Sequence, residues 1–124
     1  MTVLIVEDNP NLLEAIADAV ELYGYRVVKA SSGAEAISAL ETLDGELELL
    51  ISDFTLPGWY GHELYSRIHQ LYPRCKGIIM SGYTPCPAIE AIETNPCLSF
   101  LPKPFGMAEL GNHVASLLGP GSES

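Results

Sequence analysis

The segment Thr2-Val-Leu-Ile-Val-Glu7, followed by Asp8-Asn-Pro10, is the clearest indication of the fold class of this chain. Its continuous apolar run of strand length is typical of a strand buried on both faces of a parallel sheet. Asn9 can then cap a helix that accommodates Pro10 in its first turn. Apolar residues recur at helical spacing as far as Gly24, which is expected to end this helix. The opening residues therefore predict a strand followed by a helix.

The same alternation of strand and helix continues along the chain. Further strands are predicted at 26–30, 47–53, 77–81 and 98–102, with a loop at 54–60. One helix is predicted from Ser32 or Gly33 to near Gly45, and others around 64–71, 89–92 and 110–117. The helix around 89–92 is the weakest, because Pro85 and Pro87 precede it. Five strands that alternate with five helices indicate a parallel sheet that helices cover on both faces.

The hydrophobic pattern of the strands also predicts their order in the sheet. The strands at 2–7, 47–53 and 77–81 are almost wholly apolar, which favours central positions. The strand with Arg26 and Lys29 and the short strand with Ser99 tolerate water, which favours the two edges. We therefore predict an α/β fold of the flavodoxin-like, doubly wound (βα)5 type, with a five-stranded parallel sheet in the order 2-1-3-4-5. Ligands of such sheets bind beyond the carboxyl ends of strands 1 and 3, where the strand order reverses.

The size and charge of the chain restrict its function. Its 124 residues suit one domain, predicted at 1–118, and the polar residues 119–124 are expected to form a flexible tail or linker. The net charge is −10, so neither direct nucleic-acid binding nor contact with an anionic membrane surface is expected. The three cysteines form no metal-binding pattern, and reduced thiols in a cytoplasmic domain are the expected state.

Charged and polar residues gather at the predicted strand ends. Strand 1 ends in Glu7 and Asp8, and strand 3 ends in Asp53. Strand 4 ends in Ser81, and strand 5 leads into Lys103. Neighbouring strands lie about 4.8 Å apart, so the three carboxylates must share a small volume in which they repel one another. A hard divalent cation relieves that repulsion, and Mg²⁺ suits carboxylates combined with water and phosphate oxygens. Lys103 can pair with one carboxylate or with a phosphoryl oxygen.

Five short motifs, in order and at the predicted strand ends, carry a family resemblance. They are Glu7-Asp8, Asp53, Leu56-Pro57 with Gly61 downstream, Ser81-Gly82, and Lys103-Pro104-Phe105. With these motifs, residues 2–118 resemble the receiver domain of response regulators in two-component signalling systems. The runs Ser81-Gly-Tyr83 and Phe100-Leu-Pro-Lys-Pro-Phe105 are similar to those of receivers attached to hybrid sensor histidine kinases.

The resemblance implies a role for each charged residue of the site. Asp53 would be the phosphoacceptor, which takes a phosphoryl group from a phosphohistidine of a histidine kinase or phosphotransfer protein. Mg²⁺ would be the cofactor, held by Asp8, Asp53 and the backbone carbonyl of Thr55, with Glu7 acting directly or through a water molecule. Lys103 would offset negative charge on the transferring group. The domain would be no enzyme in the ordinary sense, because it would catalyse only its own phosphorylation and slow dephosphorylation.

The resemblance also implies a switch that changes the binding of partners. The Ser81 hydroxyl would bind the attached phosphoryl group, and Phe100 occupies the position of the aromatic switch residue. Simple packing in an edge strand is the alternative explanation for Phe100. The peptide bond between Lys103 and Pro104 is a candidate cis bond. Partners would use the surface of helix 4, strand 5 and helix 5, through which the family also forms homodimers.

Three other functions fit parts of the sequence. A degenerate receiver would bind partners without being phosphorylated, but the complete set of acids, hydroxyl and lysine argues against it. A Mg²⁺-dependent phosphohydrolase with an aspartyl intermediate would usually carry a second acid two residues after the nucleophile, where this chain has Thr55. A flavodoxin-like electron carrier would need a phosphate-binding loop after strand 1, where Glu7 and Asp8 would repel a flavin phosphate.

Overall fold

The structure is a computed structural model that describes residues 1–82, 90 and 92–118. The expected tail at 119–124, residues 89 and 91 of the predicted helix around 89–92, and the prolines before that helix lie outside these residues. The labelled elements in chain order are β1 (Thr2–Val6), α1 (Pro10–Leu22), β2 (Arg26–Ala30), α2 (Gly33–Glu41), β3 (Leu49–Asp53), β4 (Thr55–Leu56), β5 (Trp59–Tyr60), α3 (Gly61–Leu71), β6 (Lys76–Ser81), β7 (Leu98–Pro102) and α5 (Met107–Leu118).

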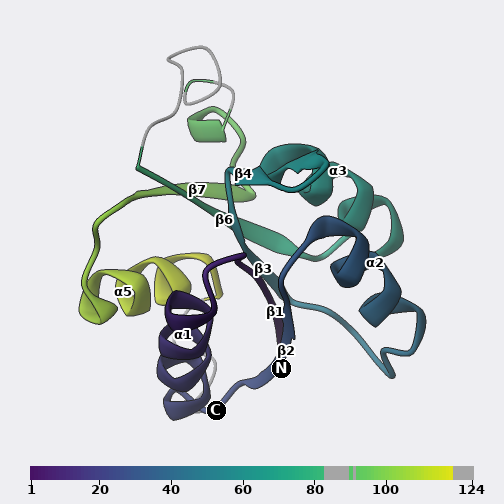
Figure 1. The fold of residues 1–124 in the computed structure, drawn as a ribbon, viewed down its shortest axis with the longest axis horizontal. Helices are drawn as coiled ribbons and strands as arrows, with labels where there is room; N and C mark the ends of the chain where they lie inside the picture. Colours follow the sequence, from purple (N-terminus) through teal and green to yellow (C-terminus); the bar gives the residue numbers. More distant parts are fainter. Residues whose placement is uncertain (83–89, 91, 119–124) are drawn as a thin grey trace.

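Five strands form one parallel sheet in the order β2-β1-β3-β6-β7 (Figure 1). Since β6 and β7 are the fourth and fifth strands of this sheet along the chain, the predicted order 2-1-3-4-5 is confirmed. Every residue of the central strand β1 is buried, whereas Arg26 and Lys29 in the edge strand β2 are exposed. Charged residues thus mark the edge because there they keep contact with water.

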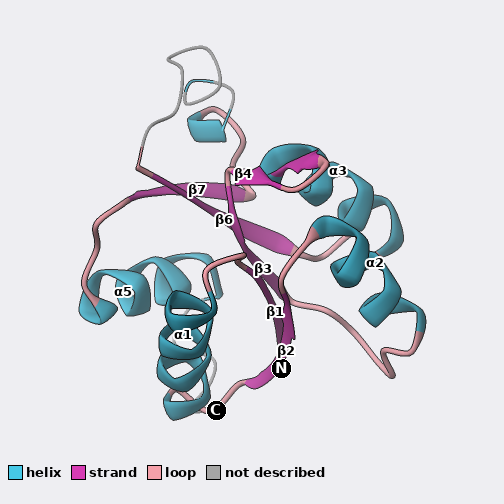
Figure 2. Ribbon diagram, viewed as in Figure 1, coloured by secondary structure: helices cyan, strands magenta, loops and turns pink. Residues whose placement is uncertain are grey.

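Helices cover both faces of the sheet (Figure 2). On one face α1 and α5 close a core in which Ile5 of β1 meets Ile16 of α1. On the other face α2 and α3 close a second core, in which Leu4 meets Leu40 of α2. Because successive strand residues face opposite cores, both must be apolar, which explains the continuous apolar runs in the sequence. Among the described residues, no helix has the length and apolar character that crossing a membrane requires.

Side-chain caps fix where the first two helices begin. Asn9 caps α1, and its side chain accepts hydrogen bonds from two backbone N–H groups of the first turn. Ser32 caps α2 in the same way by accepting from the N–H of Glu35, so this helix begins at Gly33. After α1, Gly24 has a φ of 95°, which lies in the left-handed region where glycine ends helices.

Several predicted boundaries differ from the structure, among them the end of the second helix and the start of the third strand. The second helix ends at Glu41, earlier than expected, and Gly45 with its φ of 96° turns the chain in the following loop. The third strand begins at Leu49 and not at Leu47, although Leu47 is also fully buried. An apolar residue that packs on the core next to a strand cannot be distinguished from a strand residue by hydropathy alone.

The segment 54–60, predicted as a loop, contains a short antiparallel hairpin. Its strands β4 and β5 pair Thr55 with Tyr60 and Leu56 with Trp59. The turn between them passes through Gly58, whose φ of 77° is the conformation that tight turns reserve for glycine. Each strand has only two residues, which is too short to leave a periodic pattern in the sequence. The hairpin connects the carboxyl end of β3 directly to α3. It therefore adjoins the place between β1 and β3 where the strand order reverses.

Candidate functional site

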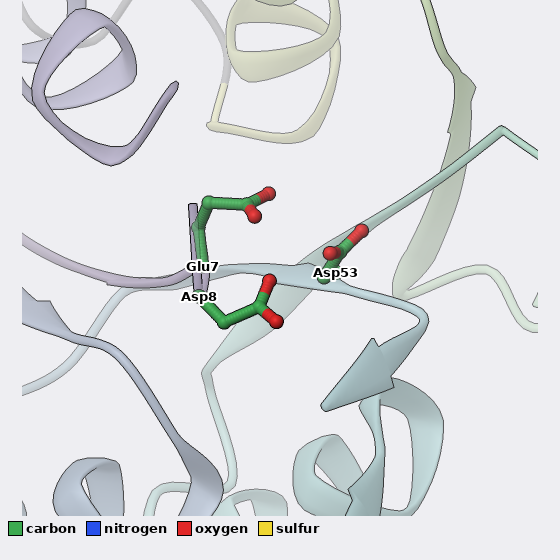
Figure 3. A group of neighbouring side chains, drawn as sticks. All are labelled: Glu7, Asp8 and Asp53. Atoms are coloured by element: carbon green, nitrogen blue, oxygen red, sulfur yellow. The ribbon is translucent and has the colours of Figure 1, made fainter. Parts of the chain in front are cut away.

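The three predicted acids meet at the carboxyl ends of β1 and β3. Glu7 and Asp8 directly follow β1, and Asp53 is the last residue of β3. The two strands are parallel neighbours, with Val6 opposite Ser52, so their ends lie side by side. One carboxylate oxygen from each acid lies within 4.8 Å of the others. The side chains of Glu7 and Asp8 extend to the same side, where Asp53 lies (Figure 3).

Lys103 binds two of these acids at once. Its Nζ donates a hydrogen bond to Oε1 of Glu7 at 3.0 Å and lies 2.9 Å from Oδ1 of Asp53. The residue directly follows β7, and its backbone N–H donates to the carbonyl of Ser81 at 2.8 Å. The peptide bond to Pro104, for which the sequence left cis and trans open, is cis. The fifth strand of the sheet thus delivers an ammonium group to acids at the ends of the first and third.

Glu7 is the buried member of the acid cluster. Its side chain is 1 % exposed, and its second oxygen, Oε2, accepts a hydrogen bond from the backbone N–H of Asn9 at 2.9 Å. Burial raises the pKa of Glu7, and the charge of Asp53 acts in the same direction, against hydrogen bonds from Asn9 and Lys103. The contribution of Asn9 was missed in the sequence, where this residue shows only the pattern of a helix cap.

Asp53 is partly accessible, with 15 % of its side chain exposed. Burial raises the pKa of Asp53, although the hydrogen bond and the charge of Lys103 oppose this. Burial alone would lower the pKa of Lys103, but hydrogen bonds and charges from Asp53 and Glu7 outweigh it, so the pKa is raised. Lys103 therefore stays charged beside a carboxylate that molecules from solution can reach.

The donor set fits a hard divalent cation. Glu7, Asp8 and Asp53 supply three carboxylates and Lys103 one ammonium, which leaves two negative charges when all four groups are ionised. The acids offer only oxygen ligands, the type that Mg²⁺ prefers. Thr55, whose backbone carbonyl is the fourth expected ligand, begins β4 two residues after Asp53. The three acids that the sequence assigned to the metal therefore come together, and Thr55 lies on the hairpin that follows Asp53.

Ser81 lies next to the acids on the adjoining strand. It is the last residue of β6, and the residue before it, Met80, pairs with Asp53 of β3. Only 7 % of Ser81 is exposed. The predicted hydroxyl group therefore lies one position beyond Asp53 at the same edge of the sheet.

Phe100 lies two residues before the end of β7, whereas Asp53 and Ser81 are the last residues of their strands. It lies in β7 opposite Ile79. Its side chain is half-buried and packs against a small cluster of Phe54, Ile79 and Ile92. Phe54 directly follows Asp53, so this cluster connects Phe100 with the site. The part played by Phe54 was not foreseen, because a single aromatic residue after a strand has no distinguishing pattern.

A largely apolar hollow adjoins the site. It has a volume of about 410 Å³ and is lined by Leu12, Gly82, Lys103, Pro104 and Phe105. Lys103 thus contacts the acids with its ammonium group and borders the hollow as well. The hollow gives another molecule an apolar surface next to the charged centre.

The comparison with known sequences agrees with this geometry. The chain is 33 % identical over 117 residues to the sensor kinase CckA of Brucella abortus, a match that covers 94 % of this chain and 12 % of the relative. It is 36 % identical to the response regulator protein FleR of Pseudomonas aeruginosa, covering 98 % of this chain and 26 % of the relative. The chain therefore spans about an eighth and about a quarter of these relatives. The response regulator receiver protein CpdR of Brucella abortus is 27 % identical, with 94 % and 95 % covered.

Solved structures show the same similarity. The receiver domain from the hybrid histidine kinase CckA superposes with a TM-score of 0.78 at 30 % identity, covering 94 % of this chain and 99 % of that one. A CheY-like response regulator receiver domain protein from Methanospirillum hungatei JF-1 gives a TM-score of 0.82 at 26 % identity, covering 99 % and 98 %. The family model of the response regulator receiver domain matches residues 3–115. This match over most of the chain, on a sheet of the expected order, shows that the chain belongs to the response regulator receiver domain family.

Proposed function

We propose that the chain is a phosphoacceptor in a two-component phosphorelay and that Asp53 accepts the phosphoryl group from a phosphohistidine. The observation that carries this proposal is the Lys103 ammonium, held 2.9 Å from Oδ1 of Asp53 beside two further carboxylates. A partly exposed carboxylate next to a fixed positive charge is suited to covalent phosphoryl chemistry. Membership of the receiver family supports the same assignment.

In the proposed step, a carboxylate oxygen of Asp53 attacks the phosphorus atom of the phosphohistidine. The O–P bond forms as the P–N bond breaks, and the imidazole nitrogen leaves with the electron pair of that bond. Lys103 holds Asp53 in position and offsets negative charge on the transferring group. Glu7 directs the ammonium into the site through its 3.0 Å hydrogen bond. The chain thus acts on its own carboxylate and needs no separate substrate site.

Mg²⁺ is the proposed cofactor, with Asp8, Asp53 and the backbone carbonyl of Thr55 as ligands. When bound, the ion supplies positive charge that stabilises the oxygens of the phosphoryl group. Asp8 is exposed and free to adjust its side chain without disturbing the core. Glu7 already uses both carboxylate oxygens for hydrogen bonds to Lys103 and Asn9, which favours its binding through a water molecule.

The proposed output is a shift between two arrangements of Ser81 and Phe100 once Asp53 carries the phosphoryl group. The partners in phosphotransfer are a histidine kinase or a phosphotransfer protein, for which the apolar hollow beside Lys103 offers a contact surface. The surface around β7 and α5 is proposed for downstream partners or a homodimer. The net charge of −10 supports a signal that passes to proteins and not to nucleic acid.

Intact mass measured after phosphorylation tests the function. The protein is incubated with Mg²⁺ and either acetyl phosphate or a phosphorylated phosphotransfer protein. The wild type and the control Asp44→Asn, which changes an exposed acid in a loop, should each gain one phosphoryl group. Asp53→Asn should gain none while keeping the fold. Labelling of Asp53→Asn, or failure of the wild type with both donors, contradicts the proposal.

A further inference from the structure

The β4–β5 hairpin rests on α2 through a contact that requires a glycine. Gly33, the first residue of α2, is buried beneath the indole ring of Trp59. A methyl group built on Gly33 would lie 2.6 Å from Cγ and 2.8 Å from Nε1 of Trp59 and closer still to Cδ1. The backbone of Gly33 is helical, a conformation that every residue adopts, so the ring and not the backbone demands glycine here.

The other end of the hairpin is fixed against the phosphoacceptor strand. Gly61 directly follows β5, and its N–H donates to the carbonyl of Phe54 at 2.6 Å. A methyl group on Gly61 would collide with the carbonyl oxygen of Asp53 and lie 3.2 Å from the carbonyl carbon. Both neighbours are backbone atoms, which cannot move aside without shifting the site. The hairpin is therefore held between α2 and the end of β3.

Trp59 and the buried Leu56 both hold the hairpin on the α2 side. Two-residue strands are too short to keep a hairpin in place by their own hydrogen bonds. Trp59 is half-buried and packs against the apolar core between the sheet, α2 and α3. It pairs with Leu56, the residue after Thr55, so a displaced ring would move the strand that carries Thr55.

We propose that Trp59, seated on Gly33, is a positioning residue that presents the backbone carbonyl of Thr55 to the metal site. The start of α2 is thereby coupled to metal binding at Asp53. This inference rests on the proposed function in taking Thr55 as a ligand. The contact between Trp59 and Gly33 lies outside the acid cluster, and metal binding by the acids does not by itself require it.

A double-mutant cycle tests the contact, with the dissociation constant for Mg²⁺ measured by isothermal calorimetry. Gly33→Ala should weaken Mg²⁺ binding about tenfold, the effect typical of disturbing groups that support metal ligands. Trp59→Ala should weaken it to a similar extent, and Trp59→Phe less, because a ring remains on Gly33. The double variant Gly33→Ala/Trp59→Ala should bind like Trp59→Ala, because no ring is left for the new methyl group to displace.

Tryptophan fluorescence gives a second readout, because Trp59 is the only tryptophan of the chain. Gly33→Ala should shift its emission to the red as the ring leaves the core. Gly106→Ala is the matched control, since no described atom lies within 4 Å of a methyl group at that position. It should change neither the emission nor the affinity. Circular dichroism and the thermal midpoint without Mg²⁺ establish that each variant is folded.

Two results would overturn the inference alone. One is that Gly33→Ala binds Mg²⁺ as tightly as the wild type. The other is that the losses of Mg²⁺ affinity caused by Gly33→Ala and by Trp59→Ala add up in the double variant. A wild type that binds Mg²⁺ but accepts no phosphoryl group would overturn the proposed function. The role of Trp59 and Gly33 in Mg²⁺ binding could still be tested. A wild type that does not bind Mg²⁺ would overturn both.

Discussion

Replacing Lys103 by methionine removes the positive charge from the site and keeps the unbranched side chain. Glu7, only 1 % exposed, would lose its 3.0 Å partner and stay buried beside Asp53. Removing one partner of a buried ion pair costs about 3–5 kcal/mol. Because Lys103 itself is 25 % exposed, solvent screens part of this, and we expect a loss of about 2–3 kcal/mol in the free energy of unfolding at neutral pH.

The loss should grow as the pH rises. Burial raises the pKa of both Glu7 and Asp53, so each binds protons more tightly in the folded than in the unfolded state. The stability that such a group contributes is complete below its ordinary pKa and is lost as the pH rises through the higher folded value. Lys103 lowers both folded pKa values, so its removal widens this gap. Lys103→Met should therefore approach the wild type as the pH falls toward the ordinary values of 3.8 and 4.5.

Urea unfolding followed by circular dichroism, repeated from acid to neutral pH without Mg²⁺, measures the effect. The matched control is Lys29→Met, which breaks a 2.8 Å ion pair with Glu14 whose side chains are 45 % and 59 % exposed. Water solvates both of these groups, so the control should leave the free energy of unfolding unchanged. Equal losses for the two variants, or a Lys103→Met loss that does not vary with pH, would refute the argument from the burial of Glu7.

Three further predictions concern the metal, the sheet and the thiols. Mg²⁺ at about ten times its dissociation constant should add about 1.4 kcal/mol to the free energy of unfolding and about 5 °C to the melting temperature. An unchanged calorimetric melting temperature at millimolar Mg²⁺ would contradict the metal site. Gly77→Ala should cost about 1–3 kcal/mol, because its methyl group would lie 2.7 Å from Cδ2 of Leu98. Urea unfolding beside Gly106→Ala checks this, and equal stabilities would count against it. Burial raises the pKa of the Cys75 thiol to about 12, so iodoacetamide at mildly alkaline pH should modify half-buried Cys97 far sooner. Peptide mass mapping over time measures the two rates, and equal rates for Cys75 and Cys97 would contradict this prediction.

The elements that were predicted correctly depend on neighbours in the sequence. Asn9 caps the helix that begins at the next residue, and Gly24 turns the chain two residues after that helix ends. The edge position of β2 followed from Arg26 and Lys29, because charged side chains in a strand need water. These features follow from the conformational and hydration preferences of individual residues, which the sequence displays directly.

The hairpin within residues 54–60 depends on contacts with residues that are remote in the sequence. Pro57 and Gly58 predict a turn, but whether the two residues on each side pair as strands depends on what holds them together. Here Trp59 packs on Gly33, which lies in a different helix, and Gly61 fits against Asp53. Neither contact leaves a periodic pattern in the sequence, so the loop was predicted and the hairpin was missed.

Hydropathy and spacing along the chain were enough to place Glu7, Asp8 and Asp53 at or just beyond the ends of neighbouring strands, and hence to predict that three carboxylates converge at one edge of the sheet. They also placed Lys103 after the last strand. The contact of Lys103 with Glu7 as well as Asp53, and the burial of Glu7 with both oxygens in hydrogen bonds, became evident only in the folded structure. Lys103 and Glu7 are 96 residues apart in the chain. Spacing within an element follows from backbone geometry, whereas the distance between such remote residues is set by how the whole core packs.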